Sequence, residues 1–378
     1  MKQFLLPTGW NVRLFGQCIS KVKYTDKQPT KSFLEEGLFP VISQEKEFIN
    51  GYSNNEDAVF TVKKPVVIFG DHTKNVKYVD FDFVIGADGV KILQPIQEID
   101  SKYFYYYLCN IRLRDLGYAR HYKLLKECVV CYPSLPEQKR IVEKLDKIFA
   151  NIDKAKEQTT QNLKNAQEVF ESSLDAVLTK EAAKWPEKKL NDVCVVERGS
   201  SPRPIKSFIT TAPDGVNWIK IGDCSGKYVT STSQKITPEG AKKSRYVRRG
   251  DFIISNSMSY GKPYIMDIDG YIHDGWFVLR LNHSILVADF LYYILSSPFA
   301  KRQYDILAAG AIVQNISSDL IKKVKFNLPS ISEQKRIVAQ LDNLHNKTQE
   351  LEKVYTQKLV DLDELKQSVL QQAFSGKL

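Results

Sequence analysis

The side chains of this 378-residue chain that are best suited to binding chemistry are lysines and arginines interleaved with aromatic residues in three short segments. Residues 242–249 form the densest segment, and residues 74–78 and 120–123 form smaller ones. Lysine and arginine bind phosphate groups, and arginine also hydrogen-bonds base edges. Each segment alone also fits an ordinary solvated surface. The candidate contacts to a polyanion are Lys74, Lys77, Arg120, His121, Lys123, Lys242, Lys243, Arg245, Arg248 and Arg249.

The overall charge favours a nucleic acid as the partner of these segments. The net charge is +10 and the pI is near 9.0, which favours polyanionic partners. No apolar run approaches the about eighteen residues that a membrane-spanning helix needs. The apolar part of residues 1–7 is too short for a signal peptide. We therefore expect a nucleic acid as the partner, no membrane association, and a cytoplasmic location.

Motifs that indicate catalysis are missing from the sequence. It contains no GxxxxGK[ST] phosphate loop, no GxGxxG, no HExxH, and no Asn-Pro-Pro-aromatic tetrapeptide of the kind amino-methyltransferases use on a flipped base. The five histidines share no metal-ligand spacing. For the adjacent pairs Asp71-His72 and His273-Asp274 we favour surface hydrogen bonding over acid–base catalysis. We therefore expect no catalytic residue, metal or cofactor on this chain.

The cysteines also argue against a metal or redox site. Residues 128–131 have CxxC spacing, but they lie in an apolar, β-branched run that predicts a strand, with no second pair and no histidine cluster nearby. The six cysteines are scattered, as is typical of buried thiols in a reducing compartment.

The elements that must position these residues come from a tandem repeat. Residues 133–142 (PSLPEQKRIV) return as residues 329–338 (PSISEQKRIV), and a helical segment of about 45 residues occurs twice. The preceding parts repeat more faintly, with residues 67–68 matching 253–254 and residues 88–89 matching 274–275. The predicted order is globule, helix, globule, helix, with boundaries at residues 1–132, 133–180, 181–328 and 329–378.

Both helical copies begin at a capping signal and continue with heptads. Ser134 precedes Glu137 by three residues, as Ser330 precedes Glu333. In the first copy the heptad spacing slips between Ala155 and Leu163, which resembles a stutter. The predicted apolar seam of the second copy is Ile337, Leu341, Leu344, Thr348, Leu351, Tyr355, Leu359, Leu362, Leu365 and Val369.

Each helix is expected to span about 42 residues, or roughly 63 Å, and a helix this long needs a partner. We expect the two helices to pair with each other as an intramolecular antiparallel coiled coil, which relates the globules by an approximate two-fold axis. The alternative is that each helix joins an oligomeric bundle. Two similar heads on one basic chain suit two half-sites on a duplex, so we expect double-stranded DNA as the partner.

Each globule is predicted to be α+β and mostly strands. Short β-like runs occur at residues 65–70, 83–86, 251–255 and 276–281, separated by turn signals. The tyrosine-rich residues 103–107 match the amphipathic residues 290–295. We expect both stretches to be helices that pack into the core, with base stacking by the tyrosines as the alternative.

The P-x-x-x-E-Q-x-x-I-V start of each helix, the heptads that follow and the ending QQAFSGKL at residues 371–378 resemble the DNA specificity subunit of Type I restriction-modification systems. The resemblance covers the whole chain. It implies two variable target-recognition domains, separated by a central helix and closed by a C-terminal one. The recognition domains vary so much in this family that no base-reading residue carries over by motif.

The resemblance also implies a function and partners. Such subunits are non-catalytic, each recognition domain reads one half of a bipartite asymmetric DNA sequence, and the antiparallel helices dock two methyltransferase subunits. Restriction subunits can join the assembly. S-adenosylmethionine, ATP and Mg²⁺ would then belong to the partners. We assign to partner docking or to the coiled coil Glu137, Gln138, Ile141, Leu145, Glu333, Gln334, Ile337 and Leu341.

Two other functions fit the residues. One is a DNA-binding coiled-coil scaffold outside restriction, which uses its helices for another partner. The other is a DNA-acting nuclease with an unrecognised site. A neighbouring gene for an Asn-Pro-Pro-Phe methyltransferase would favour the specificity subunit, and metal-dependent cleavage by the isolated chain would favour the nuclease.

Overall fold

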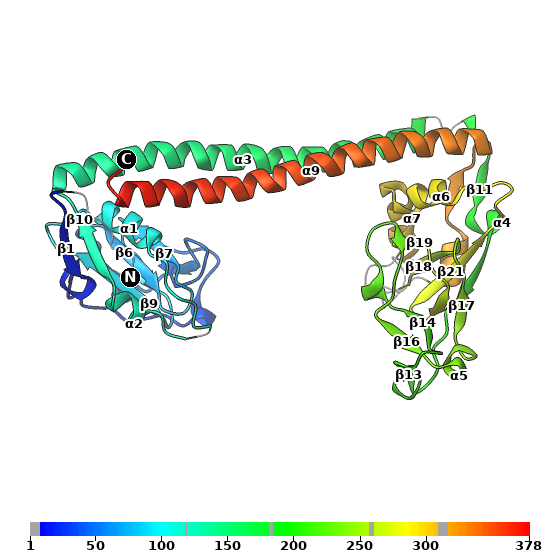
Figure 1. Ribbon diagram of the computed structural model, residues 1–378, viewed down its shortest axis with the longest axis horizontal. Coiled ribbons are helices and arrows are strands. Elements are labelled where there is room, and N and C mark those ends of the chain that lie inside the picture. Colours follow the sequence, from blue (N-terminus) through cyan, green and yellow to red (C-terminus); the bar gives the residue numbers. More distant parts are fainter. Residues whose placement is uncertain (1–7, 118, 181–183, 257–260, 309–316) are drawn as a thin grey trace. The chain divides into compact units, whose positions relative to one another are not determined.

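A computed structural model of the chain describes residues 8–117, 119–180, 184–256, 261–308 and 317–378, and it divides into two compact units (Figure 1). Unit 1 comprises Met1–Thr160 with Thr356–Leu378, and unit 2 comprises Gln161–Tyr355. The sequence-based division places boundaries at the ends of the long helices. The compact units instead divide both long helices near their middle, because each globule packs against parts of both.

The globule of unit 1 contains two packed sheets, with strand orders β2-β9-β6-β7 and β4-β3-β8-β5, and a separate ribbon β1-β10. Ile68 and Ile92 of the first sheet meet Ile42 and Phe83 of the second in the core between them. The strands are β1 Asn11–Leu14, β2 Ile19–Ser20, β3 Phe39–Ile42, β4 Gly51–Ser53, β5 Val59–Phe60, β6 Val66–Gly70, β7 Val76–Val79, β8 Phe83–Ile85, β9 Val90–Pro95 and β10 Val129–Tyr132.

Helix α1 (Ser101–Asn110) packs on the other face of the first sheet of unit 1, and the short helix α2 (Tyr122–Lys126) follows it. The helix begins after Asp100 because this side chain accepts hydrogen bonds from the free N–H groups of the first turn. Tyr103, Tyr106 and Tyr107 are buried in the core. The prediction of a packed tyrosine helix is confirmed, and base stacking by these rings is excluded in this conformation.

The globule of unit 2 repeats this plan. Its sheets have the orders β12-β21-β18-β19-β15 and β13-β16-β14-β20-β17, with a ribbon β11-β22. The strands are β11 Glu187–Lys189, β12 Cys194–Arg198, β13 Ile209–Thr210, β14 Val216–Ile219, β15 Tyr228–Val229, β16 Gln234–Ile236, β17 Arg245–Val247, β18 Phe252–Ser255, β19 Pro263–Met266, β20 Gly270–Ile272, β21 Trp276–Leu281 and β22 Lys325–Asn327. The helices are α4 Leu190–Val193, α5 Pro238–Ala241, α6 Ala288–Ser296, α7 Pro298–Ala308 and α8 Ser318–Lys322.

The two globules share one topology in their central strands. The order β2-β9-β6-β7 corresponds to β12-β21-β18-β19, and β4-β3-β8-β5 corresponds to β16-β14-β20-β17. The second sheet of each contains a single parallel pair, β3 with β8 and β14 with β20. Residues 67–68 and 253–254, matched in the sequence, fall on the equivalent strands β6 and β18. The predicted tandem repeat of two α+β globules is therefore confirmed.

The two long helices are α3 (Leu135–Lys180) and α9 (Ile331–Phe374), and within each unit they run antiparallel (Figure 1). In unit 1, Lys156 pairs with Asp363, and Asp153 lies 3.2 Å from Lys366. In unit 2 the ring of Phe170 lies 5.1 Å from that of His345. The helices are thus each other's partner, as predicted, and no oligomeric bundle is needed to bury the seam. None of the helices described has the length and apolarity to cross a membrane.

The seam of the coiled coil differs from the predicted one at two positions. Leu351 and Leu365 are 45% and 47% exposed, whereas the neighbouring Glu352 and Lys366 are half-buried. At these two positions the seam therefore contains the charged residues Glu352 and Lys366 instead of the predicted leucines. Long charged side chains can pack their aliphatic carbons against an apolar surface while the charged group stays in water. In α3 the buried Thr159 occupies the seam within the predicted slip.

Candidate nucleic-acid interface

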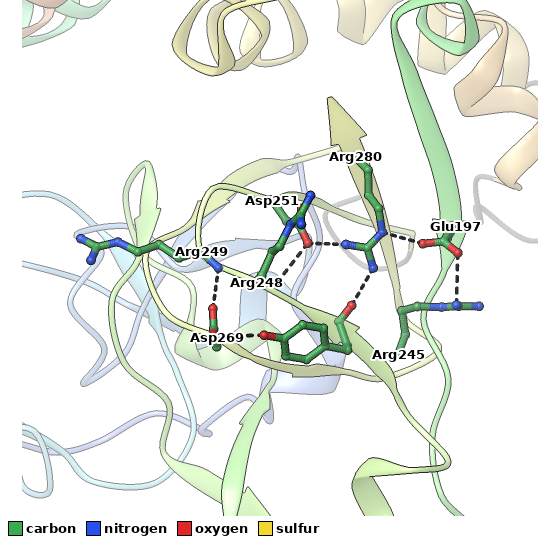
Figure 2. A network of polar contacts seen from close by, with 8 residues as sticks. Glu197, Arg245, Arg248, Arg249, Asp251, Asp269 and Arg280 are labelled. Atoms are coloured by element: carbon green, nitrogen blue, oxygen red, sulfur yellow. Dashed lines mark hydrogen bonds and ion pairs between the residues drawn. The ribbon is translucent and has the colours of Figure 1, made fainter. Parts of the chain in front are cut away.

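The densest basic segment lies at the edge strand β17 of unit 2, and its arginines are held by carboxylates (Figure 2). Arg245 stands opposite Ile272 in the sheet, on the face toward the first sheet, where its Nη1 lies 3.2 Å from Glu197 Oε1. Arg280 lies between Glu197 and Asp251, with N–O distances of 2.8 and 2.6 Å. Arg245 therefore connects the two sheets through an ion pair and is not a free surface cation.

The turn after β17 presents two further arginines. The backbone N–H of Arg248 donates to Asp251 at 3.0 Å, and that of Arg249 donates to Asp269 at 2.7 Å. The guanidinium of Arg249 also donates to Asp267 at 2.8 Å. The Arg248 and Arg249 side chains remain 65% and 73% exposed. The carboxylates thus fix the turn and leave both guanidinium groups at the surface.

The electrostatic field of this segment is weaker than its sequence suggests. Together with Asp267, the network of Figure 2 contains four arginines and four carboxylates, so their formal charges cancel. Lys242 and Lys243 are exposed, and within the described part of the chain neither has an ion-pair partner. The Lys243 ammonium lies 4.9 Å from the ring centre of Phe208. These two lysines are therefore the least compensated cations of the segment.

In unit 1, three of the predicted polyanion contacts lie where a ligand could reach them. Arg120 and Lys123 are exposed. Lys74 occupies a left-handed turn with φ 62°, and its Nζ lies 3.1 Å from Asp115. A hydrogen bond from the backbone N–H of Gly117, assisted by Lys74, lowers the pKa of Asp115.

Two other candidates in unit 1 are wrong as surface contacts. Lys77 is only 5% exposed, and its ammonium donates to the carbonyls of Ser43, Glu47 and Phe48. These hydrogen bonds hold the loop between β3 and β4 in place. His121 is fully buried, and its Nε2 accepts the N–H of Leu116 at 3.1 Å. Both side chains are committed to loop structure in this globule.

The adjacent histidine–aspartate pairs have structural contacts. Asp71 is buried, whereas the sequence predicted a surface position, and it accepts the N–H of Tyr122 at 2.8 Å. His273 accepts the N–H of Gly275 at 2.9 Å through Nδ1, and burial lowers the pKa of its imidazole. The described residues include no group of three or more histidine, cysteine or acidic side chains arranged to hold a metal ion.

Residues 129–131 of the CxxC segment lie in strand β10 (Val129–Tyr132), so the predicted strand is confirmed, and Cys128 directly precedes it. β10 pairs with β1, and Cys131 stands opposite Val12. The thiol of Cys128 donates to the carbonyl of Leu124, and burial raises its pKa. All six cysteines are free.

A buried glutamine at the start of α3 attaches this helix to the globule of unit 1. Gln138 Oε1 accepts the N–H of Asp100 at 2.8 Å, and Nε2 donates to the carbonyls of Glu98 and Pro133, each at 2.9 Å. The glutamine thus joins the first turn of α3 to the first turn of α1.

The same arrangement occurs in unit 2 at the repeated position. Gln334 Oε1 accepts the N–H of Val287 at 2.8 Å, and Nε2 donates to the carbonyls of Ile285 and Pro329 at 2.8 and 2.9 Å. This geometry explains why the Glu-Gln helix start occurs twice in the sequence.

An aspartate two turns later makes a second matched contact. Asp146 accepts the Tyr106 hydroxyl at 2.5 Å and pairs with Lys102 at 2.8 Å. Asp342 accepts the hydroxyl of Tyr293, the counterpart of Tyr106. The repeat of this aspartate was visible in the sequence, but its tyrosine partner, 40 residues earlier in unit 1 and 49 residues earlier in unit 2, was not identifiable there.

Of the eight residues assigned to docking or to the coiled coil, six are buried within their own unit. The two glutamines are at most 1% exposed, and so are Ile141, Leu145, Ile337 and Leu341. Glu137 and Glu333 lie nearer the surface and pair with the arginine three residues later. The buried six therefore serve packing between helix and globule and are not available to a partner.

Comparison with known proteins gives the family. A family model for the Type I restriction modification DNA specificity domain matches residues 7–165 and again residues 183–360. The chain belongs to this family. Among its relatives is the EcoR124I/EcoR124II specificity subunit of Escherichia coli, 27% identical over 85% of this chain and 84% of that one. The EcoBI specificity subunit of Escherichia coli is 28% identical over 68% of this chain and 60% of that one.

Solved structures agree in fold with this specificity-subunit chain. A chain solved in work on complex assembly and conformational transition of the type I R-M system matches with a TM-score of 0.77 and 20% identity, and 99% of each chain is covered. The HsdS subunit from Thermoanaerobacter tengcongensis matches with a TM-score of 0.54 and 22% identity, covering 100% of this chain and 99% of that one.

Family membership settles the class of function. The chain is a non-catalytic DNA specificity component of a Type I restriction-modification system, so the catalytic activities lie in other subunits. This decides against a nuclease and against a scaffold outside restriction.

Proposed function

We propose that the chain reads a bipartite asymmetric DNA sequence, one half with each globule, and docks two methyltransferase subunits through its long helices. Restriction subunits join the same assembly. S-adenosylmethionine, ATP and Mg²⁺ are bound by these partners, which carry out methyl transfer and cleavage.

One observation carries this proposal. Each globule is attached to a long helix by the same contacts, a buried glutamine and an aspartate–tyrosine bond, although the rest of the two globules has diverged. Matched attachment with different surfaces is what two independent readers on one frame require. A reader of a single symmetric site would need two equal surfaces instead.

The phosphate contacts come from cations that a ligand can reach. In this proposal the exposed Arg120 and Lys123 and the half-buried Lys74 contact the backbone of one half-site. In the second globule the corresponding contacts come from Lys242, Lys243, Arg248 and Arg249. Such contacts fix the position of a protein on DNA and carry no sequence information, which must come from other side chains.

Reconstitution tests the proposal. The purified chain is mixed with its cognate methyltransferase, labelled S-adenosylmethionine and genomic DNA, and methylated positions are mapped. We expect adenine methylation at one bipartite sequence only when both proteins are present. Methyl transfer by this chain alone, or methylation by the mixture without sequence preference, would contradict it.

A further inference from the structure

A hollow of about 490 Å³ lies in unit 2, next to strands β14 and β16 of the second sheet. Arg203, Lys220 and Gln234 contribute polar groups to its wall, and Ile205 and Ile209 contribute apolar ones. We propose that this hollow is the base-reading site of the second globule, with Arg203 and Gln234 as the residues that determine the sequence of its half-site. This inference rests on the proposed function and deepens it.

The sheet places the hollow and the basic segment on one surface. Gln234, Trp218, Tyr271 and Tyr246 stand directly opposite one another across β16, β14, β20 and β17, so they share one face. The opposite face of this sheet carries Ile219, which packs on the first sheet. The row therefore lies on the face away from the first sheet, where Trp218 is buried with Ile236 and Ala241. The hollow lies at the Gln234 end of the row, and the exposed arginines after β17 follow Tyr246 at the other end.

The length of this row fits a duplex. Three strand spacings amount to about 14 Å, because neighbouring strands lie about 4.8 Å apart. The major groove of B-DNA is about 12 Å wide. A side chain at Gln234 can therefore reach base edges in the groove while Arg248 and Arg249 reach the phosphates at its border.

One polar group of the hollow, Arg203, contacts a carboxylate, and all three polar side chains have free hydrogen-bonding capacity. Asp274 accepts the Ser201 hydroxyl at 2.6 Å and lies 3.4 Å from one guanidinium nitrogen of Arg203. Arg203 is nevertheless 84% exposed, and a guanidinium has five N–H donors. Within the part of the chain that the structure describes, the side-chain amide of Gln234 and the ammonium of Lys220 have no hydrogen-bond or ion-pair partner.

These side-chain types match base edges. Glutamine pairs with the N6 and N7 atoms of adenine, and arginine pairs with the O6 and N7 atoms of guanine. The isoleucines of the hollow offer an apolar contact of the kind that a thymine methyl group makes with protein. Arg245, by contrast, is held by Glu197 between the sheets and has no such role.

The test uses the complex of the full chain with its cognate methyltransferase and maps methylated sites in genomic DNA. Gln234→Ala and Arg203→Ala are compared with Lys235→Ala, which alters the next residue of β16, on the opposite face of the sheet. We expect each of the first two variants to lose discrimination at one or two positions of one half-site by about 5- to 150-fold. The other half-site and the Lys235→Ala profile stay unchanged.

The outcomes separate this inference from the proposed function. If the unaltered complex methylates no bipartite site, the proposed function fails. If it does, and Gln234→Ala and Arg203→Ala keep the unaltered site with unchanged discrimination, only the base-reading hollow is refuted. If Gln234→Ala lowers the melting temperature of the protein, Gln234→Glu replaces it in the test, because glutamate has nearly the same size as glutamine. A glutamate accepts from the N4 amino group of cytosine, so this variant must shift the preferred base, and an unchanged preference overturns the inference.

Discussion

Single buried side chains hold each globule on its long helix. Gln138 and Gln334 satisfy one backbone N–H and two carbonyls each, in positions sealed from water. A buried polar group without a partner costs about 1–3 kcal/mol, so the glutamine stabilises the junction mainly by preventing that loss. Because the same glutamine contacts occur in both halves of the chain, the effect of replacing one glutamine can be compared with that of replacing the other.

We predict that Gln138→Ala lowers the free energy of unfolding by about 1–3 kcal/mol, because the N–H of Asp100 and two carbonyls lose their partner. The neighbouring Lys139 is exposed and provides the control, since Lys139→Ala should change the free energy of unfolding by less than about 0.5 kcal/mol. Urea denaturation followed by circular dichroism measures both. Equal small effects would show that the glutamine contributes nothing to the junction.

Lys77 leads to a prediction about pH. Burial lowers its pKa from 10.5 to about 8, so between these values the unfolded chain binds more protons than the folded one. Stability contributed by this group therefore rises as pH increases from about 8 to 10.5. We predict that Lys77→Met removes this rise when the free energy of unfolding is compared with that of the unaltered protein across the window. Parallel pH profiles would contradict the assignment.

The lysines of the basic segment make a prediction about DNA affinity. Replacing Lys242 and Lys243 by alanine should flatten the log–log salt dependence of binding by about 0.9 for each phosphate that is no longer neutralised. Arg245→Ala should leave the slope unchanged, because Arg245 already pairs with Glu197 between the sheets. Fluorescence anisotropy with a duplex of the methylated site at several salt concentrations measures the slope. The assignment fails if the slope responds to Arg245 and not to the lysines.

At the scale of elements, equivalent sheets carry different surfaces. The outer row of unit 2 is Gln234, Trp218, Tyr271 and Tyr246, whereas the equivalent strands of unit 1 place Gly51, Val41, Val84 and Val59 in one row. The strand order is kept because the inner faces pack on the first sheet in both globules. On the other face the two sheets pack differently, because Val41 and Val84 are buried in a small cluster with Ala58 in unit 1, whereas Trp218 is buried with Ile236 and Ala241 in unit 2.

The coiled coil gives a prediction about packing within one helix. Leu341 is 1% exposed, and Leu341→Ala should lower the free energy of unfolding by about 2–5 kcal/mol, because it leaves a cavity between helix and globule. Leu351→Ala, in the same helix, should lower it by less than about 1 kcal/mol, because this side chain is half in solvent. Urea denaturation of both variants decides, and similar losses would place Leu351 back on the seam.

Elements with a periodic or repeated signal could be predicted from the sequence. The long helices, the buried tyrosine helix and the strands predicted at residues 65–70 and 251–255 follow from local pattern and from the repeat, and the strands are observed at residues 66–70 and 252–255. The prediction of the seam was wrong at Leu351 and Leu365, because periodicity does not tell which of two neighbouring side chains turns inward. The packing of α9 against α3 decides it at Lys366, whose ammonium lies 4.8 Å from the ring centre of Phe149 and 3.2 Å from Asp153.

The site was harder to predict for a related reason. Lys77 and His121 look like surface cations in the sequence, but long-range contacts bury them. Arg280 and Glu197 lie 83 residues apart and meet only through the sheet. Local composition identified a basic segment, whereas the neutralising carboxylates and the hollow around Gln234 depend on tertiary structure.

At the scale of the whole molecule, the proposed function treats the chain as one frame that carries two readers. The family model matches twice, and each match contains one globule with part of the helical frame. Because the attachment contacts are the same in both halves, a globule from a relative with the same Glu-Gln helix start should fit the frame. The two halves of the recognised sequence should then be separable.

Exchange of one globule tests this central claim most directly. Residues 1–132 are replaced by the corresponding domain of a relative that recognises a different sequence, and the complex with the cognate methyltransferase is used to map methylated sites. We predict that one half of the bipartite site changes to that of the donor, while the other half and the spacing stay the same. A change in both halves, or retention of the original site, would contradict independent reading by the two globules.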